Sequence, residues 1–163
     1  MNTVTIVPTH EVALIKSLAY KIWPKVYCNM ISSEQIDYML NWMYSIETLQ
    51  TNINNGHQFY LGKENAEALG FMGIQINYTP NEMKLHKLYV QADCHGKGIG
   101  KALIEKAKSI AKENQQKAIV LQVNRENPAV SFYKKLGFEI NKLEVSDIGG
   151  GFVMDDYIMS LSI

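Results

Sequence analysis

The sequence predicts an α/β fold in a single domain, residues 1–163, with a mixed central sheet of six to seven strands flanked by about four helices. Its length of 163 residues and its 47% hydrophobic content suffice for one globular domain with a sizeable core. Segments with helical spacing of apolar residues occur between short β-type segments. Residues 83–103 join a strand, a glycine-rich loop and the start of an amphipathic helix, and the other predicted elements are arranged around them.

Composition and charge exclude several classes of function. Sixteen Lys and Arg side chains balance sixteen Asp and Glu side chains, so no overall field attracts nucleic acid or an anionic membrane. The N-terminus lacks the basic and apolar regions of a signal peptide, and no apolar run approaches the roughly 20 residues of a membrane span. We therefore expect a cytoplasmic protein without nucleic-acid or membrane partners. Cys28 and Cys94 are isolated thiols, which predicts neither a disulfide nor a metal site.

The first half of the chain predicts one strand followed by helices. Val4 and Ile6 alternate with threonine before Pro8, which is the pattern of a short strand. Ser32 and Gln35 form a capping-box pair in front of an apolar stripe, which predicts the start of a helix. The expected elements are a strand at residues 3–7, a helix from Thr9 until Pro24 interrupts it, a helix from Ser32 to Met43 and a short helix over residues 46–53.

The second half predicts the remaining strands and two helices. Three strands form an antiparallel meander, and after the glycine loop a helix leads to a strand parallel to the last of the three. Asn127 is a suitable N-cap with Pro128 at the first helical position, and Gly137 ends that helix. The expected elements are strands at residues 57–61, 68–78 and 83–90, a helix at 100–112, a strand at 118–123, the helix from Asn127, and a closing hairpin of strands at 138–145 and 152–160.

The glycine-rich loop predicts a phosphate-binding site. Gly96, Gly98 and Gly100 lie between a strand and a helix N-terminus, where unpaired backbone N–H groups and the positive end of the helix dipole favour an anion. The third glycine comes one residue too early for the dinucleotide fingerprint G-x-G-x-x-G. A P-loop needs a glycine and a hydroxyl where this chain has His95 and Ala102. The loop therefore fits neither of these two nucleotide-binding motifs.

Two segments instead resemble the signatures of the GCN5-related N-acetyltransferases. His95-Gly-Lys-Gly98-Ile-Gly100 resembles the acyl-CoA loop of that family, with His95 in place of the usual Gln or Arg. Asn127-Pro-Ala-Val-Ser-Phe-Tyr133-Lys-Lys-Leu-Gly-Phe138 is similar to the second signature of the family. Both lie within residues 83–138, about a third of the chain. The resemblance implies the GNAT fold, acetyl-CoA as cosubstrate and transfer of an acetyl group to an amine.

The resemblance also implies which residues hold the cofactor. The strand before the loop offers main-chain groups of Leu88 and Val90 to the pantetheine arm, although both are also ordinary core positions. The loop wraps the pyrophosphate, and Lys97 and Lys101 either add positive charge or are solvated helix residues. Asn127 contacts the pantetheine arm, caps its helix, or does both. The implied cofactor-binding set is Leu88, Tyr89, Val90, His95, Gly96, Lys97, Gly98, Ile99, Gly100, Lys101, Asn127 and Tyr133.

Two residues are candidates for proton transfer. Tyr133 matches the family tyrosine that protonates the leaving thiolate, and the alternative is a helix tyrosine that packs on the core. Leu85-His86-Lys-Leu88-Tyr-Val90 resembles a segment of the arylalkylamine N-acetyltransferases in which the histidine serves as the base. Period-two alternation places His86 on the strand face of Leu88 and Val90. The alternative is therefore a half-buried histidine, with an ordered water as the base.

The acceptor is expected between the first helices and the closing hairpin, as in the family. Trp23, Tyr27 and Asp155 are candidates for binding an alkyl or aryl amine and its cation, although aromatic residues at helical spacing are more often core. Cys94 has no base paired with it in the sequence, which favours direct attack over an acyl-enzyme. We expect acetyl transfer to the primary amine of a small molecule such as a polyamine or an arylalkylamine. A protein or peptide acetyltransferase, a non-catalytic acyl-CoA sensor and a homodimer are left open.

Overall fold

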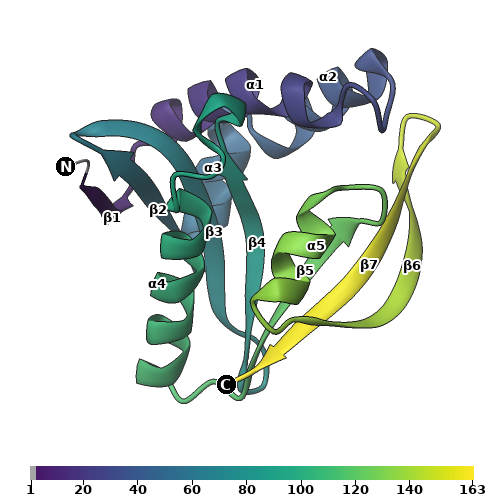
Figure 1. Ribbon diagram of the computed structural model, residues 1–163. Coiled ribbons are helices and arrows are strands. Elements are labelled where there is room, and N and C mark those ends of the chain that lie inside the picture. The colour runs from purple at the N-terminus through teal and green to yellow at the C-terminus, as the bar shows by residue number, and fades with distance from the viewer. Residues whose placement is uncertain (1–2) are drawn as a thin grey trace.

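The computed structural model describes residues 3–163, which form a mixed seven-stranded sheet in the order β1-β2-β3-β4-β5-β7-β6 (Figure 1). β4 and β5 are parallel, and the other neighbouring pairs are antiparallel. This confirms the predicted mixed α/β fold. The elements in order are β1 Val4–Thr9, α1 Val12–Tyr27, α2 Ser33–Met43, α3 Ile46–Asn54, β2 His57–Glu64, β3 Glu67–Thr79, β4 Glu82–Val90, the 3-10 turn η1 Ala92–Cys94, α4 Ile99–Glu113, β5 Ala118–Asn124, α5 Ala129–Lys135, β6 Glu139–Gly149 and β7 Phe152–Ser162.

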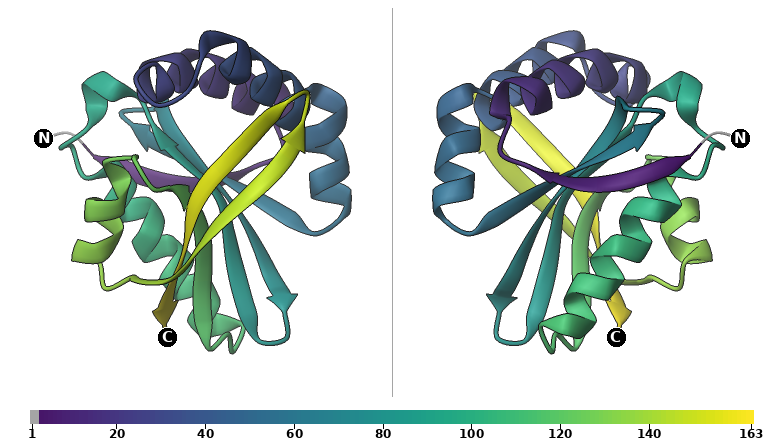
Figure 2. Two further views of the ribbon diagram at one scale, coloured as in Figure 1. Left: turned by 90° about the vertical axis from the view of Figure 1, so that its right-hand side faces the viewer. Right: turned by 90° about the vertical axis from the view of Figure 1, so that its left-hand side faces the viewer.

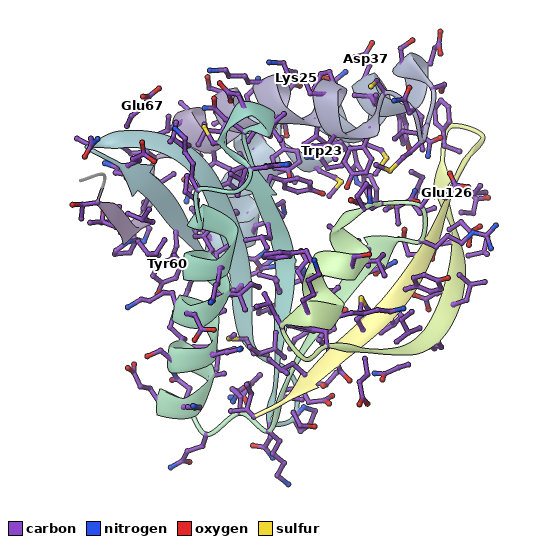
Figure 3. All side chains as sticks on the ribbon, viewed as in Figure 1. Trp23, Lys25, Asp37, Tyr60, Glu67 and Glu126 are labelled. Carbon is purple, nitrogen blue, oxygen red and sulfur yellow. The ribbon has the colours of Figure 1, made fainter. Side chains whose placement is uncertain are left out.

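Helices cover both faces of the sheet and divide the core in two (Figure 2). α1, α2 and α3 pack on one face, and α4 and α5 pack on the other. Alternation along β3 sends Phe71 into the first core and Met72 into the second, and both are fully buried. Figure 3 shows the same division within α1, where Trp23 points inward and Lys25 points outward. Within residues 3–163, no helix has the length and apolar character needed to cross a bilayer.

Hydroxyl caps start α2 and α3. The Ser32 Oγ accepts a hydrogen bond from the Gln35 N–H at 3.1 Å, in front of α2. The Ser45 Oγ accepts one from the Thr48 N–H at 3.1 Å, in front of α3. Each bond satisfies an N–H group that the first helical turn leaves without a partner. The two predicted helices are confirmed, the first with the predicted cap.

The first helix differs from the prediction at both ends. α1 begins at Val12, because β1 continues to Thr9 and the Thr9 Oγ1 accepts a hydrogen bond from the Glu11 N–H at 3.0 Å instead of capping a helix. The helix also continues past Pro24 to its end at Tyr27. Proline removes only one N–H donor there, close to the helix end. Trp23 before the proline and Tyr27 at the helix end are buried, and they hold this last turn against the core.

The hairpin between β2 and β3 is tighter than predicted. Asn65 and Ala66 have φ values of 51° and 74°, so they form the two-residue turn that suits the twist of a hairpin. β2 therefore runs through Gly62 to Glu64, a stretch that the sequence predicted as a loop. Gly62 serves close packing and not a turn, since a Cβ at this position would lie 2.7 Å from Ile99 Cγ2 of α4.

The closing hairpin is also longer than predicted, and its tip contacts α2 (Figure 2). β6 extends to Gly149. The Tyr38 hydroxyl of α2 donates a hydrogen bond to the Ile148 carbonyl at 2.8 Å. Gln35 Nε2 of the same helix donates to the Val153 carbonyl at 2.9 Å. These bonds fix the C-terminal hairpin to the N-terminal helices.

Candidate functional site

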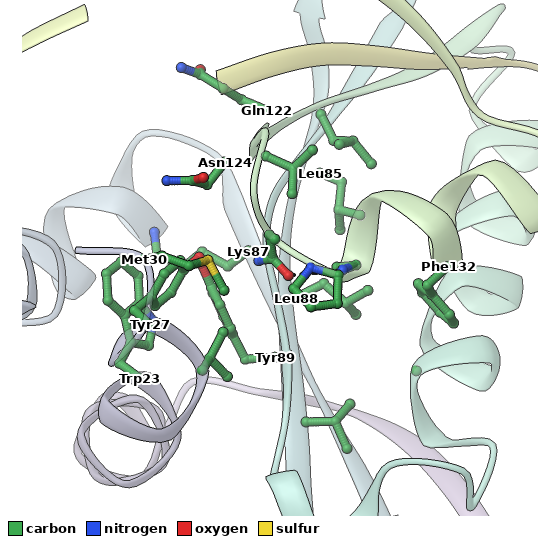
Figure 4. A pocket seen from close by; sticks show the side chains of 18 of the residues that line it. Trp23, Tyr27, Met30, Leu85, Lys87, Leu88, Tyr89, Gln122, Asn124 and Phe132 are labelled. Atoms are coloured by element: carbon green, nitrogen blue, oxygen red, sulfur yellow. Dashed lines mark hydrogen bonds between the residues drawn. The ribbon is translucent and has the colours of Figure 1, made fainter. Parts of the chain in front are cut away.

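The candidate site lies where two parallel strands separate. β4 and β5 pair over Glu82–Leu85 and Ala118–Leu121, and beyond these residues they diverge. The diverging ends line a cavity of about 1220 Å³ together with α1, α2, the glycine loop, α5 and the closing hairpin. In Figure 4, Leu88 of β4, Asn124 of β5 and Tyr27 of α1 stand around this cavity. A ligand in it therefore touches the sheet, both helix layers and the hairpin.

Main-chain groups at the end of β4 face this gap. The Gln91 N–H donates a hydrogen bond to the Leu69 carbonyl at the end of β3, at 2.9 Å. Because an antiparallel ladder alternates, the N–H and C=O groups of Leu88 and Val90 point away from β3. The Val90 carbonyl accepts a hydrogen bond from His95 Nε2 at 2.9 Å, so this nitrogen carries a proton. The Val90 N–H and the two main-chain groups of Leu88 stay on the open edge of β4, where the sequence placed them.

The glycine loop presents backbone N–H groups at the start of α4. Gly98 caps this helix with a φ of 84° and without a side-chain bond, and Gly96 has a φ of 90°. The first helical hydrogen bond runs from the Ala102 N–H to the Gly98 carbonyl at 3.0 Å. The N–H groups of the three preceding residues therefore point out of the helix end, and the helix dipole adds positive charge there. A pyrophosphate fits this arrangement.

The two loop lysines have different surroundings. Lys97 Nζ lies 3.5 Å from Glu64 Oε1 at the end of β2. Lys101 is exposed and lines the cavity. A surface ion pair like that of Lys97 contributes at most about 1 kcal/mol, so it does not hold the side chain strongly. Lys101 is the better placed of the two to meet a phosphate.

α5 places Asn127 at the cavity. The Asn127 Oδ1 accepts a hydrogen bond from the Ala129 N–H at 2.9 Å, which is the predicted capping bond. The helix starts at Ala129, one position later than predicted, with Pro128 in front of it. α5 also lies close to α4, since a Cβ on Gly100 would be 3.2 Å from Phe132 Cζ. The two signature segments are thus held together by direct packing.

Tyr133 of α5 lines the cavity and is only 6% exposed. Its ring packs edge-on against Phe132 and Phe138. Burial raises the pKa of Tyr133 well above its usual range, and the neighbouring Tyr27 raises it further. The hydroxyl therefore keeps its proton at neutral pH and is available as a donor.

His86 does not lie on the face that simple alternation predicts. The β3–β4 ladder pairs Gly73 with Lys87 but Ile74 with Leu85, so His86 is the extra residue of a β-bulge. A bulge shifts the alternation by one position, which the sequence-based prediction did not include. The histidine consequently joins a different set of neighbours from the leucine and valine that follow it.

The neighbours of His86 are polar and aromatic side chains from β2 and β3. Its ring stacks on that of His57 with centroids 4.1 Å apart, and its Nε2 lies 2.9 Å from the Gln75 Oε1. An amide oxygen only accepts, so Nε2 carries a proton. Burial, with smaller contributions from His57 and the nearby lysines, lowers the pKa of His86 to about 2. Leu88 and Val90 instead pack in the core under α4 and α5.

Two of the three predicted acceptor-binding residues line the cavity. Trp23 and Tyr27 are at the cavity wall, but both also belong to an aromatic cluster with Tyr89. The Tyr27 and Tyr89 hydroxyls lie 2.9 Å apart, and burial raises the pKa of Tyr27 to about 12. Asp155 is not among the described residues that line the cavity, and it pairs with Arg125 Nε at 3.0 Å. The structure therefore does not bring Asp155 to the acceptor.

Comparison with known proteins agrees with this geometry. The model of the acetyltransferase (GNAT) family matches residues 20–138, more than half of the chain. A spermidine N(1)-acetyltransferase of Thermoplasma acidophilum is 30% identical over 144 residues, which cover 85% of this chain and 86% of that protein. The chain belongs to the acetyltransferase (GNAT) family. It is an acetyl-CoA-dependent N-acetyltransferase.

Further GNAT relatives differ in how much of the chain they match. The crystal structure of the PaiA N-acetyltransferase from Thermoplasma acidophilum, in complex with coenzyme A, has a TM-score of 0.81 and 25% identity and covers 99% of each chain. An uncharacterized N-acetyltransferase of Methanocaldococcus jannaschii is 38% identical over 87 residues, which are 50% of this chain and 38% of that protein. The peptidyl-lysine N-acetyltransferase YjaB of Salmonella typhimurium is 41% identical over 85 residues, 51% of each chain. This chain thus matches 38% and 51% of the length of the last two relatives.

In this GNAT enzyme, the residues that line the cavity form two groups. One group comes from the glycine loop, the start of α4 and α5, and is called the cofactor group because the sequence predicts the cofactor there. The acceptor group comes from α1, α2, the middle of β4 and the closing hairpin, and it includes Met30, Met39, Trp42 and Ile148. Sequence analysis missed several members of the second group, among them Lys87, which is only 6% exposed. No signal in the sequence could have found it, because a lysine within a strand normally indicates a solvent-facing position.

Proposed function

We propose that this enzyme transfers the acetyl group of acetyl-CoA directly to the primary amine of a small molecule, and that polyamines and arylalkylamines are the first acceptors to test. One observation carries the proposal. A single cavity joins the anion-binding start of α4 to the apolar and aromatic acceptor group. Such a cavity holds a thioester and an amine beside each other, which converts an encounter of two molecules into a reaction within one complex.

The chain's own groups supply the remaining requirements. Acetyl-CoA provides the activated acyl group, the N–H groups at the start of α4 hold its pyrophosphate, and the open edge of β4 at Leu88 and Val90 orients its pantetheine arm. Tyr133 protonates the departing thiolate. Desolvation raises the pKa of the Cys94 thiol, and the adjacent Asp93 raises it further, so the thiol stays protonated and is a poor nucleophile. These features support direct attack by the amine.

The proton of the acceptor amine needs a route out of the cavity. His86 lines the cavity and remains the side-chain candidate for the base. Its low pKa and its bond to Gln75 make it a weak base for an ammonium group, whose pKa lies near 10. We therefore propose that an ordered water takes the proton and that His86 and Gln75 border its path.

A second candidate function is acetylation of a lysine side chain in a peptide or protein. The name of the Salmonella relative supports it, since that protein is a peptidyl-lysine acetyltransferase. The match to the spermidine acetyltransferase extends over more of both chains, which favours the small-molecule acceptor.

The test is release of CoA from acetyl-CoA with a panel of spermidine, arylalkylamines, aminocarboxylates and lysine peptides, with acetylated products identified by mass spectrometry. We expect turnover with at least one small amine at a kcat/KM at least about tenfold above that of any peptide. Preference for peptides would support the second function. Tight acetyl-CoA binding without turnover on any acceptor would instead identify a sensor and overturn the proposal.

A further inference from the structure

Lys87 is a buried cation without an ionic partner. It lies on β4 directly after the bulge, lines the cavity and is only 6% exposed (Figure 4). Its Nζ is 5.4 Å from the centroid of the Tyr44 ring and 5.7 Å from that of Phe59. Within residues 3–163 it makes no ion pair or hydrogen bond through Nζ. Cation–π contacts offset only part of the free energy lost when an ammonium leaves water.

Two neutral donors beside Lys87 also lack acceptors. The Trp23 Nε1 and the Tyr44 hydroxyl are buried, and neither has a hydrogen-bond partner among the described residues. The Trp23 and Tyr44 rings are in contact, with centroids 5.6 Å apart, and Lys87 lies over the second of them. Buried polar groups are nearly always paired in folded proteins. Of these donors, Lys87 and Trp23 line the cavity, so an acceptor on a ligand can reach them. A carboxylate is the strongest such acceptor.

Carboxylates of the protein do not fill this role. Asp147 lines the cavity, but its Oδ1 accepts a hydrogen bond from the Gly149 N–H in the closing hairpin. Asp156 is fully buried and accepts from Gln122 Nε2 at 3.0 Å. Neither lies within ion-pair distance of Lys87.

The charge of the cavity wall also disfavours a polycation. Lys25, Lys84 and Lys87 line it away from the glycine loop, against the single carboxylate of Asp147 among the described residues. Burial, with a smaller contribution from the neighbouring Lys84, lowers the pKa of Lys87 to about 8. A second ammonium group on the acceptor would be repelled by these lysines, whereas an anionic group would be attracted to them.

We propose that Lys87 binds a carboxylate of the acceptor, and that the preferred substrate is an aminocarboxylate whose apolar spacer lies along Met30, Met39 and Trp42. The inference rests on the proposed acetylation of a small amine and specifies its substrate class. The amine end points toward the open edge of β4, and the carboxylate end lies at Lys87 and Trp23, both of which line the cavity. Lys87 is then a specificity-determining residue and takes no part in the transfer itself.

The experiment compares acceptors of equal chain length that differ at one end. γ-Aminobutyrate, δ-aminovalerate and ε-aminocaproate are each paired with the diamine and the alkylamine of the same number of carbons. We expect the best aminocarboxylate to exceed its diamine by about tenfold or more in kcat/KM. Preference for the diamine, or for spermidine, would overturn the inference.

Variants of Lys87 test the residue itself. Lys87→Met keeps the length and the apolar stem of the side chain. We expect this variant to lower kcat/KM for the aminocarboxylate by about tenfold or more, through a higher KM. The kcat/KM for the alkylamine should change by less than about threefold. Lys87→Arg should retain part of the preference. Lys21→Met, at an exposed position on α1 that does not line this cavity, is the matched control. An equal fall in kcat for all acceptors would contradict the inference, because it would place Lys87 in the chemical step.

A binding measurement separates this inference from the proposed function. Valerate and caproate carry the carboxylate but no amine, and their binding to the CoA-loaded enzyme is measured by calorimetry, with the Lys87 pKa followed by NMR. We expect binding that raises this pKa and is lost in Lys87→Met. If no amine is acetylated but this binding persists, the proposed function fails and the carboxylate site stands. A different result would overturn the inference and leave the proposed function intact. In that case amines are acetylated, but the carboxylates either bind wild type and Lys87→Met equally well or bind neither.

Discussion

The environment of Tyr133 limits this residue to one chemical role. A phenol buried against Phe132 and Phe138 is far from ionising at neutral pH, because the phenolate would lose its hydration. It is therefore useless as a base and suited to donate a hydrogen bond or a proton to a forming thiolate. The same burial keeps the ring in place whether or not the hydroxyl acts.

We predict that Tyr133→Phe lowers kcat by about 10- to 100-fold, as expected on loss of a general acid. The dissociation constant for acetyl-CoA should change by less than about twofold, because the ring contacts remain. Steady-state kinetics and calorimetry together measure both effects. Phe132→Leu removes a neighbouring ring and serves as the packing control. Unchanged kcat in Tyr133→Phe would remove this residue from the mechanism.

We predict that His86→Gln keeps the shape of the pH–rate profile between about pH 5.5 and 8 and lowers kcat less than tenfold. The pKa of His86 is about 2, so the ring does not titrate in this range and cannot produce a limb there. Measuring kcat/KM against pH for wild type and variant is sufficient. A limb near pH 6 to 7 that disappears in the variant would instead establish His86 as the base.

At the scale of single elements, local sequence signals located most of the helices and strands but missed the bulge in β4. Caps such as Ser32 and Asn127 act through neighbours two or three residues away, so the sequence displays them directly. The bulge depends on how β4 aligns with β3, a pairing between distant residues that periodicity along one strand does not reveal. His86 was therefore assigned to the wrong strand face, although the strand itself was predicted.

The start of α4 supplies a prediction for an element. Gly98 has a φ of 84°, and a Cβ there would meet nothing within 4 Å, so Gly98→Ala introduces backbone strain without a clash. We predict a loss of about 1–2 kcal/mol in the free energy of unfolding and a rise of about tenfold in the Kd for acetyl-CoA, because the N–H groups of the loop are displaced.

Gly151 in the closing hairpin offers a matched control for this prediction. Its φ is 80°, and again a Cβ would meet nothing within 4 Å. Gly151→Ala should therefore show a similar loss of stability in chemical denaturation and an unchanged Kd for acetyl-CoA. Equal effects of the two variants on the Kd would contradict an anion-binding role for the α4 N-terminus.

For the whole molecule, buried histidines predict how stability depends on pH. Burial lowers the pKa of His57 to about 4 and that of His86 to about 2, against an unfolded value near 6.5. Below pH 6.5 the unfolded chain binds protons that the folded chain rejects, so stability falls as the pH falls toward 4 and is fully retained above 6.5. With a discount for partial solvent exposure, we predict a loss on the order of 2 kcal/mol between pH 6.5 and 4.5.

Urea denaturation at several pH values measures this dependence. His57→Gln should flatten the slope below pH 6.5, while His10→Gln, at an exposed position before α1, should leave it unchanged. An identical slope in wild type and His57→Gln would show that other groups cause the loss.

The overall architecture could be predicted from the sequence, and so could the wall of the cavity where we propose the cofactor, whereas most of the remaining wall could not. The proposed cofactor side is made of two short segments, one with the glycines and a helix start and one with a helix cap, and each is visible as a motif. The acceptor side is assembled from side chains such as Trp23, Lys87 and Ile148, which come from three distant parts of the chain. Only the packing of α1, β4 and the closing hairpin brings them together.

The bond between Tyr38 and the Ile148 carbonyl, 110 residues apart, has a consequence for how such an enzyme diversifies. Under the proposed function, residues near the two ends of the chain contact the acceptor together with Lys87 of β4, while the glycine loop and α5 hold the cofactor. We therefore expect new acceptors to be reached largely by changes near the two ends. Because the ends touch each other, substitutions in α2 and in the hairpin must be compatible, and evolutionary changes in acceptor range should occur in pairs across this contact.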